Sequence, residues 1–213
     1  MFGSNLSLWQ KNMDTKLFFT ADLHLCEKKA PNTWSFHRDF ETPEQMNDTI
    51  VAKINREVGA QDTLYVLGDV AASVEAEKWL AQINCQNMIL VMGEKDQPME
   101  MHKMLSRFFS TIFYSPTTIN IGSTDLDMSF IIGHKPSDVA KELRTQKFEQ
   151  RFVKDSSLFF GLHGHIHRAK SCGNNRDMLN VGCDLWDYVP LSLDRVMHLH
   201  GAITKYWDDE IFN

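Results

Sequence analysis

Leu17-Phe18-Phe19-Thr20-Ala21-Asp22-Leu23-His24 is an apolar run that ends on a carboxylate and an imidazole. Such a run predicts a buried β-strand over residues 17–21, with metal-ligand or catalytic side chains just after its carboxyl end. A long polar loop over residues 26–41 follows the run. The first strand of the fold therefore points to a functional edge.

The same arrangement recurs twice further along the chain. A predicted strand over residues 63–67 ends at Gly68-Asp69, and another over residues 88–92 ends at Gly93-Glu94-Lys95-Asp96. The carboxyl ends of parallel strands meet at one edge of a sheet, so we expect the three polar endings to converge.

Helices are predicted between these strands. Thr42-Pro43-Glu44-Gln45 combines an N-cap, a proline at the first helical position and an early acid, and apolar residues then repeat every four positions to a helix end near Gly59. Residues 74–83 also have helical spacing. Alternating strands and helices indicate an α/β fold.

The second half of the sequence contains more strands and fewer helices. Two halves of this kind predict two sheets stacked face to face, with helices over their outer faces. We expect residues 1–16 to be an N-terminal extension and residues 17–213 to form a single domain. The predicted strands are 111–114, 117–121, 127–132, 158–162 and 178–181, and the predicted helices are 137–147 and 192–199.

Composition narrows the classes of function. The formal net charge of −6 argues against non-specific nucleic-acid binding, which relies on clustered Lys and Arg, and fits a small phosphorylated substrate better. No apolar run approaches the ~18 residues that span a bilayer, and no secretory signal pattern begins the chain. The cysteines form no C-x-x-C pair, which favours a reducing compartment. We expect a cytoplasmic protein without membrane association.

Short His and Asp blocks carry the chemistry. A lone Gly-Asp or Gly-His at a strand end is a weak pattern, but several such endings in one chain favour metal coordination over a set of unrelated core residues. Mixed imidazole and carboxylate ligands suit manganese, iron or zinc, with nickel or cobalt as substitutes. The blocks are Asp22-Leu23-His24, Gly68-Asp69, Gly93-Glu94-Lys95-Asp96, Gly133-His134, Gly164-His165-Ile166-His167 and Asn180-Val181-Gly182.

In order, spacing and flanking strands these blocks resemble the calcineurin-like metallophosphoesterase family, over about residues 17–197. The resemblance implies a four-layer α/β-sandwich, two stacked mixed sheets flanked by helices, and two divalent metal ions that share a carboxylate. Asp69 would be the shared ligand. The first metal would take Asp22, His24, Asp69 and His167, and the second would take Asp69, Glu94, His134 and His165.

The third block departs from the family pattern G-N-H-D, because Glu94 and Lys95 occupy the Asn and His positions. Glu94 retains a metal-binding oxygen. Lys95 has a reference pKa of ~10.4, and it is a candidate catalytic group that protonates the leaving oxygen or steadies charge on phosphorus. Asp96, the other candidate in this block, and Asn180 would position the ligands.

The sequence predicts a metallophosphoesterase that hydrolyses a small phosphodiester or phosphomonoester, nucleotide-like in type, by attack of a metal-bridging hydroxide. The alternative is an impaired relative that serves as a scaffold or ligand-binding protein, with a nuclease as a less favoured activity. Specificity should depend on loops such as residues 26–41 and 171–177, and His37-Arg38 lies in the loop expected to fold over the site. His163 is predicted to be a buried residue outside the site.

Overall fold

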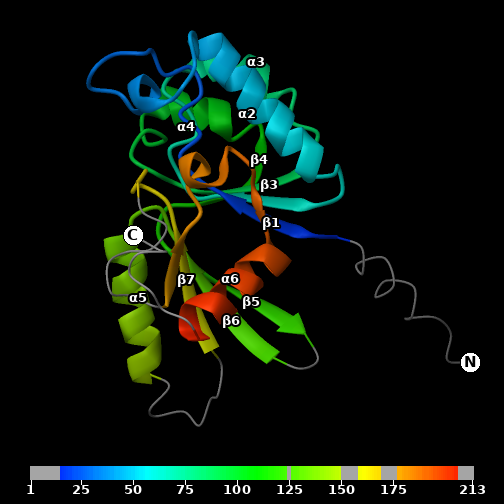
Figure 1. The fold of residues 1–213 in the computed structure, drawn as a ribbon, viewed down its shortest axis with the longest axis vertical. Helices are drawn as coiled ribbons and strands as arrows, with labels where there is room; N and C mark the ends of the chain where they lie inside the picture. The colour runs from blue at the N-terminus through cyan, green and yellow to red at the C-terminus, as the bar shows by residue number, and fades with distance from the viewer. Residues whose placement is uncertain (1–14, 124–125, 150–157, 169–176, 206–213) are drawn as a thin grey trace, which may run out of the picture.

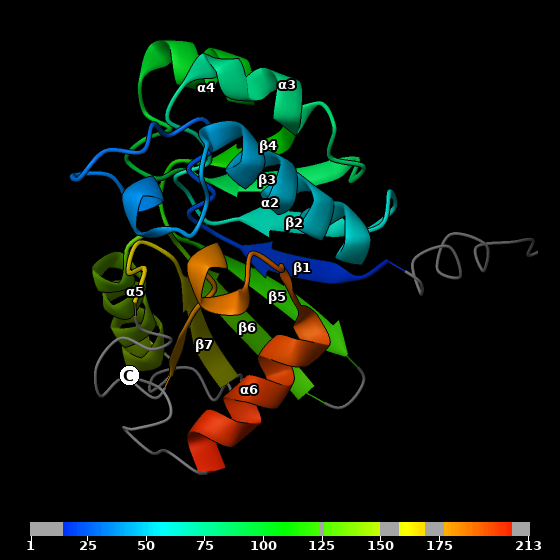
Figure 2. The same cartoon turned by 45° about the horizontal axis from the view of Figure 1, so that its top comes forward.

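The computed structural model describes residues 15–123, 126–149, 158–168 and 177–205, and the predicted N-terminal extension lies outside these residues except for Thr15 and Lys16. Within them the chain forms two stacked mixed sheets with helices on both sides (Figure 1 and Figure 2). The α/β-sandwich predicted from the sequence is therefore confirmed.

The first sheet has four parallel strands and one antiparallel edge strand. β1 pairs in parallel with β2, β2 with β3 and β3 with β4, while β9 runs antiparallel to β1. The parallel strands therefore end at a common edge, as the sequence predicted. In spatial order the strands are β4 (Phe109–Phe113), β3 (Asn87–Val91), β2 (Thr63–Val66), β1 (Leu17–Thr20) and β9 (Leu191–Ser192).

The second sheet is mixed in the same way. β5 and β6 pair antiparallel, whereas β6–β7 and β7–β8 pair in parallel. Segments that follow β6 and β7 can therefore meet the segments that follow β1 to β3. Its strands, in spatial order, are β5 (Thr117–Ser123), β6 (Leu126–Ile132), β7 (Leu158–His163) and β8 (Met178–Asn180).

The helices form the outer layers and the connections. α2, α3 and α4 lie on the outer side of the first sheet, and α5 lies against the second sheet (Figure 1). The predicted N-cap of α2 is confirmed, since the Thr42 side chain accepts a hydrogen bond from Gln45 N. The helices are η1 (Trp34–His37), α2 (Pro43–Glu57), η2 (Val74–Ala76), α3 (Glu77–Leu80), α4 (Met99–Leu105), α5 (Pro136–Glu149), η3 (Cys183–Trp186) and α6 (Leu193–Lys205).

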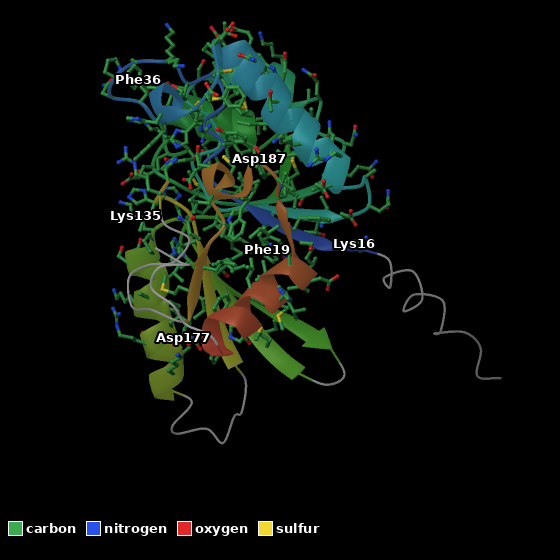
Figure 3. All side chains as sticks on the ribbon, viewed as in Figure 1. Lys16, Phe19, Phe36, Lys135, Asp177 and Asp187 are labelled. Atoms are coloured by element: carbon green, nitrogen blue, oxygen red, sulfur yellow. The ribbon has the colours of Figure 1, made fainter. Side chains whose placement is uncertain are left out.

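Adjacent side chains of β1 pack into two different hydrophobic clusters, one on each face of the first sheet. Phe18 packs in the cluster between the first sheet and its helices, and Phe19 packs in the cluster between the two sheets (Figure 3). This follows from the alternation of side chains along a strand. The Phe19 ring stacks with Phe130 of the second sheet at a centroid distance of 6.2 Å. β1 is thus anchored on both faces, which fixes where the chain emerges at Asp22.

Two expectations about the layers were wrong. Residues 111–114 were assigned to the second half of the fold, but β4 joins the first sheet beside β3. The reason is α4, a short helix that the sequence analysis missed and that carries the chain back to start a parallel strand. The helix expected over residues 192–199 is present as α6, yet its Val196 and Leu199 enter the core between the sheets instead of covering an outer face.

None of the described helices is long and apolar enough to cross a membrane. Among the described residues Cys26, Cys85 and Cys183 are free thiols, and Cys172 lies outside those residues.

Candidate metal centre

The polar segments that follow five strands meet at one edge of the sandwich. Asp22 N donates to Gly68 O and His24 N donates to Asp69 O, both at 3.0 Å, so the segments after β1 and β2 run side by side. From the second sheet, Gly164 N donates to His134 O at 3.0 Å, which joins the segments after β6 and β7. The predicted convergence of the blocks is therefore present in the fold.

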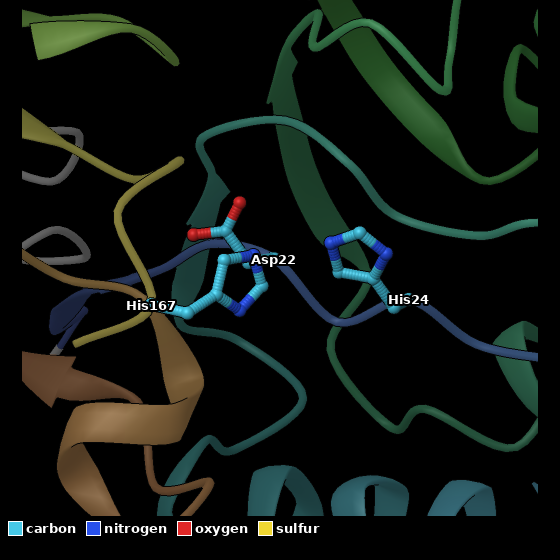
Figure 4. Close-up of side chains that lie close together, drawn as sticks. All are labelled: Asp22, His24 and His167. Carbon is cyan, nitrogen blue, oxygen red and sulfur yellow. The ribbon is translucent and has the colours of Figure 1, made fainter. Parts of the chain in front are cut away.

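A first cluster consists of Asp22, His24 and His167. One potential ligand atom from each residue lies within 4.8 Å of the others. Figure 4 shows that Asp22 and His24 come from the segment after β1, whereas His167 comes from the segment after β7. These three residues were predicted to share one metal ion.

A second cluster consists of Glu94, His134 and His165, again with ligand atoms within 4.8 Å of one another. His134 Nε2 and His165 Nδ1 are 3.2 Å apart. Two nitrogens that are each about 2.0–2.1 Å from a tetrahedral zinc ion would be roughly 3.4 Å apart. The two rings are thus spaced as ligands of a single ion would be, and they are the residues predicted for the second metal.

Asp69 lies between the two clusters. Its Oδ1 is 3.5 Å from His134 Nε2, and its Oδ2 is 3.7 Å from His24 Nε2. Asp69 also forms a third potential ligand group with Asp22 and His134. A carboxylate with one oxygen facing each cluster has the arrangement expected of a shared ligand.

Two buried polar atoms in the first cluster fit a cation. Asp22 Oδ1 and His24 Nε2 are buried and have no hydrogen-bond partner within the part of the chain that the structure describes. Buried polar atoms are nearly always satisfied, because leaving one without a partner costs free energy. An anionic oxygen and an imidazole nitrogen that face the same space form a suitable donor set for a divalent transition metal.

Hydrogen bonds fix the histidine tautomers. The partners of Nδ1 are the Glu27 carboxylate for His24 at 3.1 Å, the Asp184 carboxylate for His167 at 2.7 Å and the Leu67 carbonyl for His134 at 2.9 Å. These oxygens only accept hydrogen bonds, so Nδ1 carries the proton and Nε2 keeps a lone pair. Such outer partners orient the ligating imidazoles in metal proteins.

Burial sets the protonation of the cluster. It lowers the pKa of His134 and of His167, the latter against the opposing effect of Asp184, and so favours the neutral rings that bind metals. Burial also raises the pKa of Asp22 well above its usual range. The pKa of Glu27 is raised by burial, but the hydrogen bond from His24 and other contacts lower it to about 2.

The backbone is strained where the ligands sit. Four of the seven described non-glycine residues with positive φ are candidate ligands. Non-glycine residues rarely adopt this region, and clusters of them mark functional sites. These four residues are Asp22 (φ 58°), His24 (φ 49°), Asp69 (φ 51°) and His165 (φ 71°).

Asp96, the candidate residue expected to position the ligands, is bound by the backbone of two neighbouring turns. Asp96 is fully buried, and its carboxylate accepts backbone hydrogen bonds from Asp69 and Gly93 at Oδ2 and from Val70 at Oδ1, each at 2.9 Å. Its oxygens are therefore occupied by the chain itself. Asp96 thus holds the Asp69 turn against the Gly93 turn, which fits the positioning role expected from the sequence.

The two unusual residues of the third block face different surroundings. Glu94 forms an ion pair with the half-buried Lys135, and its Oε2 is 3.9 Å from His165 Nδ1. The Lys95 backbone N–H donates to Asp69 Oδ1 at 3.0 Å, while the Lys95 side chain is exposed. Glu94 thus belongs to the second cluster, whereas Lys95 contacts Asp69 through its backbone.

Three residues that the sequence analysis did not assign to the site support it. The Trp34 ring stacks on His167 with a centroid distance of 4.0 Å and an interplanar angle of 11°. Arg38, flagged only as part of a loop near the site, is buried and donates to both carboxylate oxygens of Asp184. Asp184 lies two residues after the Asn180-Val181-Gly182 block, and its role becomes evident from its hydrogen bond to His167.

The prediction that His163 is a buried residue outside the clusters agrees with the structure. His163 is fully buried, belongs to none of the potential ligand groups found among the described residues, and has a pKa that burial lowers to about 4. His102 bonds to Tyr114, and His200 packs against Phe160.

Together these elements define a two-sheet α/β protein with two adjoining His/carboxylate clusters at one sheet edge. No protein-family model matches the chain. The gene 66 protein of Mycobacterium phage L5 is 24% identical over 207 residues, covering 86% of this chain and 95% of that protein.

Two solved structures resemble the chain. A protein of unknown function from Aquifex aeolicus aligns with a TM-score of 0.63 at 20% identity, covering 87% of this chain and all of that one, which shows a shared fold. An archaeal phosphodiesterase aligns over 84% of this chain and 99% of its own at 16% identity, with a TM-score of 0.42. That similarity does not establish a shared fold.

Proposed function

We propose that this protein is a metal-dependent phosphoesterase that binds two divalent cations and hydrolyses a small phosphodiester or phosphomonoester. The observation that carries the proposal is the pair of His/carboxylate clusters joined by Asp69. A two-metal phosphoesterase needs two adjacent ion sites and a carboxylate between them.

Each residue has a role in this proposal. Asp22, His24 and His167 would hold one cation, and Glu94, His134 and His165 the other, with Asp69 reaching both. The unpartnered atoms Asp22 Oδ1 and His24 Nε2 support this assignment. Bound divalent ions supply Lewis acidity toward a phosphoryl oxygen and lower the pKa of bound water toward about 7.

The other residues act on the ligands and on the substrate. Glu27 and Asp184 keep Nε2 of their histidines available, and Asp96 holds the Asp69 turn. The exposed Lys95 ammonium, on the residue whose N–H binds Asp69, would meet the leaving oxygen or the phosphoryl charge. Trp34 covers His167 and limits the access of water to that ring.

The first test measures metal binding without turnover. Metal-free protein would be titrated with manganese by calorimetry, and its thermal unfolding followed in parallel. We expect two bound ions, each adding about 2.7 kcal/mol of stability at a free metal concentration of 100 times its Kd. Asp69→Asn should lose most of this binding, and Asp194→Asn, an exposed carboxylate on α6, should retain it. Absence of metal binding by the wild type would contradict the proposal.

The second test measures hydrolysis. The manganese-loaded protein should cleave bis-p-nitrophenyl phosphate or p-nitrophenyl phosphate, and Asp69→Asn should not. Preference between the two esters assigns the protein as a diesterase or a monoesterase. Two bound ions without turnover on either ester would contradict the enzymatic proposal and favour a ligand-binding or scaffold role instead.

A further inference from the structure

A pocket opens beside the second cluster and has no role in the site described so far. Its volume is about 230 Å³, and His134 and Glu94 form the wall nearest the metal centre. Its other polar walls come from the segment after β3, the β4–β5 connection and the start of α5. We call it the Tyr114 pocket, and its polar lining residues are Glu94, Gln97, Tyr114, Ser115, Lys135 and Asp138.

The pocket adjoins the second cluster and not the first, since its lining includes Glu94 and His134. At the first cluster, Trp34 stacks on His167, and the Arg168 guanidinium lies 6.0 Å from the centre of the Trp34 ring. These side chains form a wall beside the first cluster. The organic group of a phosphate ester held between the clusters would extend instead toward the second cluster and its pocket.

The pocket offers the contacts that a nucleoside uses. Tyr114 is 71% exposed, and a stack and a 2.8 Å hydrogen bond to His102 hold its ring in place. A fixed aromatic ring can stack on a base at little entropic cost. Gln97 and Ser115 can hydrogen-bond to a sugar or base.

Size and charge restrict the ligand further. The volume is below the range of about 300–1,000 Å³ that holds a drug-sized ligand, so the pocket has room for a single nucleoside. Lys135, which directly precedes α5 (Figure 3), is the one lysine or arginine among the described residues that line the pocket. It pairs there with Glu94. An ammonium in this place can meet a phosphate oxygen at the boundary between pocket and centre.

We propose that the Tyr114 pocket binds the nucleoside of a mononucleotide ester, with Tyr114 as the stacking surface and Lys135 as a contact to the phosphate. This inference rests on the proposed phosphoesterase function and specifies its substrate class. It also moves substrate recognition away from the loops of residues 26–41 and 171–177, which were the predicted determinants. Of the second loop, only Asp177 lies within the described residues.

The test compares the binding of two probes to the manganese-loaded protein by calorimetry, namely thymidine 5′-monophosphate and inorganic phosphate. The wild type should bind the nucleotide more tightly. Tyr114→Ala should lower the ratio of nucleotide to phosphate affinity about tenfold. Tyr114→Phe should preserve the ratio, because the ring remains. Phe36→Ala removes an exposed aromatic ring of η1 that does not line the pocket, and it should also preserve the ratio.

Lys135→Gln should weaken the binding of both probes, since both carry the phosphate group. Equal affinities of the wild type for the two probes, or an unchanged ratio in Tyr114→Ala, would overturn the nucleoside assignment. Hydrolysis of bis-p-nitrophenyl phosphate distinguishes this failure from that of the proposed function. A wild-type protein that does not hydrolyse this ester but binds the nucleotide in a Tyr114-dependent way would contradict the proposed phosphoesterase activity. The same result would support the nucleoside pocket.

Discussion

Arg38 and Asp184 are 146 residues apart in the sequence and meet beneath the first cluster through two hydrogen bonds. Arg38 Nε donates to Asp184 Oδ1 at 2.7 Å, and Nη2 donates to Oδ2 at 2.9 Å. Arg38 also donates to the carbonyls of Asp22 and Leu23, and Asp184 accepts from His167 Nδ1. One buried guanidinium thus joins the segment after β1 to the ligand contributed by the second sheet.

Arg38→Met should destabilise the metal-free protein by about 3–5 kcal/mol, because it leaves the Asp184 carboxylate without its buried partner. Urea unfolding of the two proteins measures the difference. Arg107→Met is the matched control, since Arg107 pairs with Glu77 in a largely exposed salt bridge and should cost less than about 1 kcal/mol. Equal decreases in the free energy of unfolding would show that the buried Arg38–Asp184 pair contributes no more to stability than the exposed pair.

Asp184→Asn should reduce manganese affinity about 10- to 100-fold while the fold persists. The amide has nearly the same shape, but it no longer provides the negative charge that holds His167 Nδ1–H and raises the basicity of Nε2. Calorimetric titration provides the measurement. Asp187→Asn, a change of the same kind in a carboxylate that is 80% exposed, should leave the affinity unaltered. An Asp184→Asn protein with wild-type affinity would remove Asp184 from the site.

Gly93→Ala should weaken metal binding indirectly, by displacing Asp69. An added Cβ would lie 2.3 Å from Asp69 Oδ1 and 2.5 Å from Asp69 N, so the Asp69 turn must shift. We expect a loss of about 1–3 kcal/mol in stability and weaker metal binding. At Gly201 an added Cβ meets no heavy atom of the described residues within 4 Å, and Gly201→Ala should bind metal normally. Unchanged metal binding in Gly93→Ala would mean that Asp69 is not held by this contact.

Lys95→His should raise turnover on esters with poor leaving groups, provided that the Lys95 side chain faces the phosphate. General acid catalysis contributes typically about 10²–10⁴-fold for such groups and much less for p-nitrophenolate. The ratio of phenyl phosphate to p-nitrophenyl phosphate turnover should therefore increase. Lys28→His, at another exposed lysine, should leave this ratio unchanged. The same ratio in Lys95→His and the wild type would show that the Lys95 side chain points elsewhere.

The sequence predicted the parts of the fold that local patterns encode. The strand ends at Asp22, Asp69 and Glu94 and the N-cap at Thr42 were located correctly, because apolar runs and capping residues are short-range signals. The sheet to which β4 belongs was not predicted correctly, because it depends on α4. The seven residues of α4 form too short a pattern to be recognised in the sequence.

The sequence was enough to predict the candidate ligands of the site. It was not enough to predict the residues that hydrogen-bond to those ligands. His24 and His167 lie in blocks with ligand spacing, so their residue types indicated metal coordination. Glu27 and Asp184 look like ordinary acids in the sequence, and only tertiary contacts bring them to Nδ1 of these rings. Asp96 was expected to position the ligands, but the sequence does not reveal that it does so by accepting backbone N–H groups at both of its oxygens.

The positive φ angles of Asp22, His24, Asp69 and His165 set thermodynamic stability against ligand binding. Each non-glycine residue held in this region costs of order 1–3 kcal/mol, which the surrounding packing must offset. Glycine at His24 would relieve that strain and remove a ligand in the same step. Selection for stability alone would therefore tend to replace these four residues with glycine. Their presence means that the chain keeps the four side chains at a cost in backbone conformational energy.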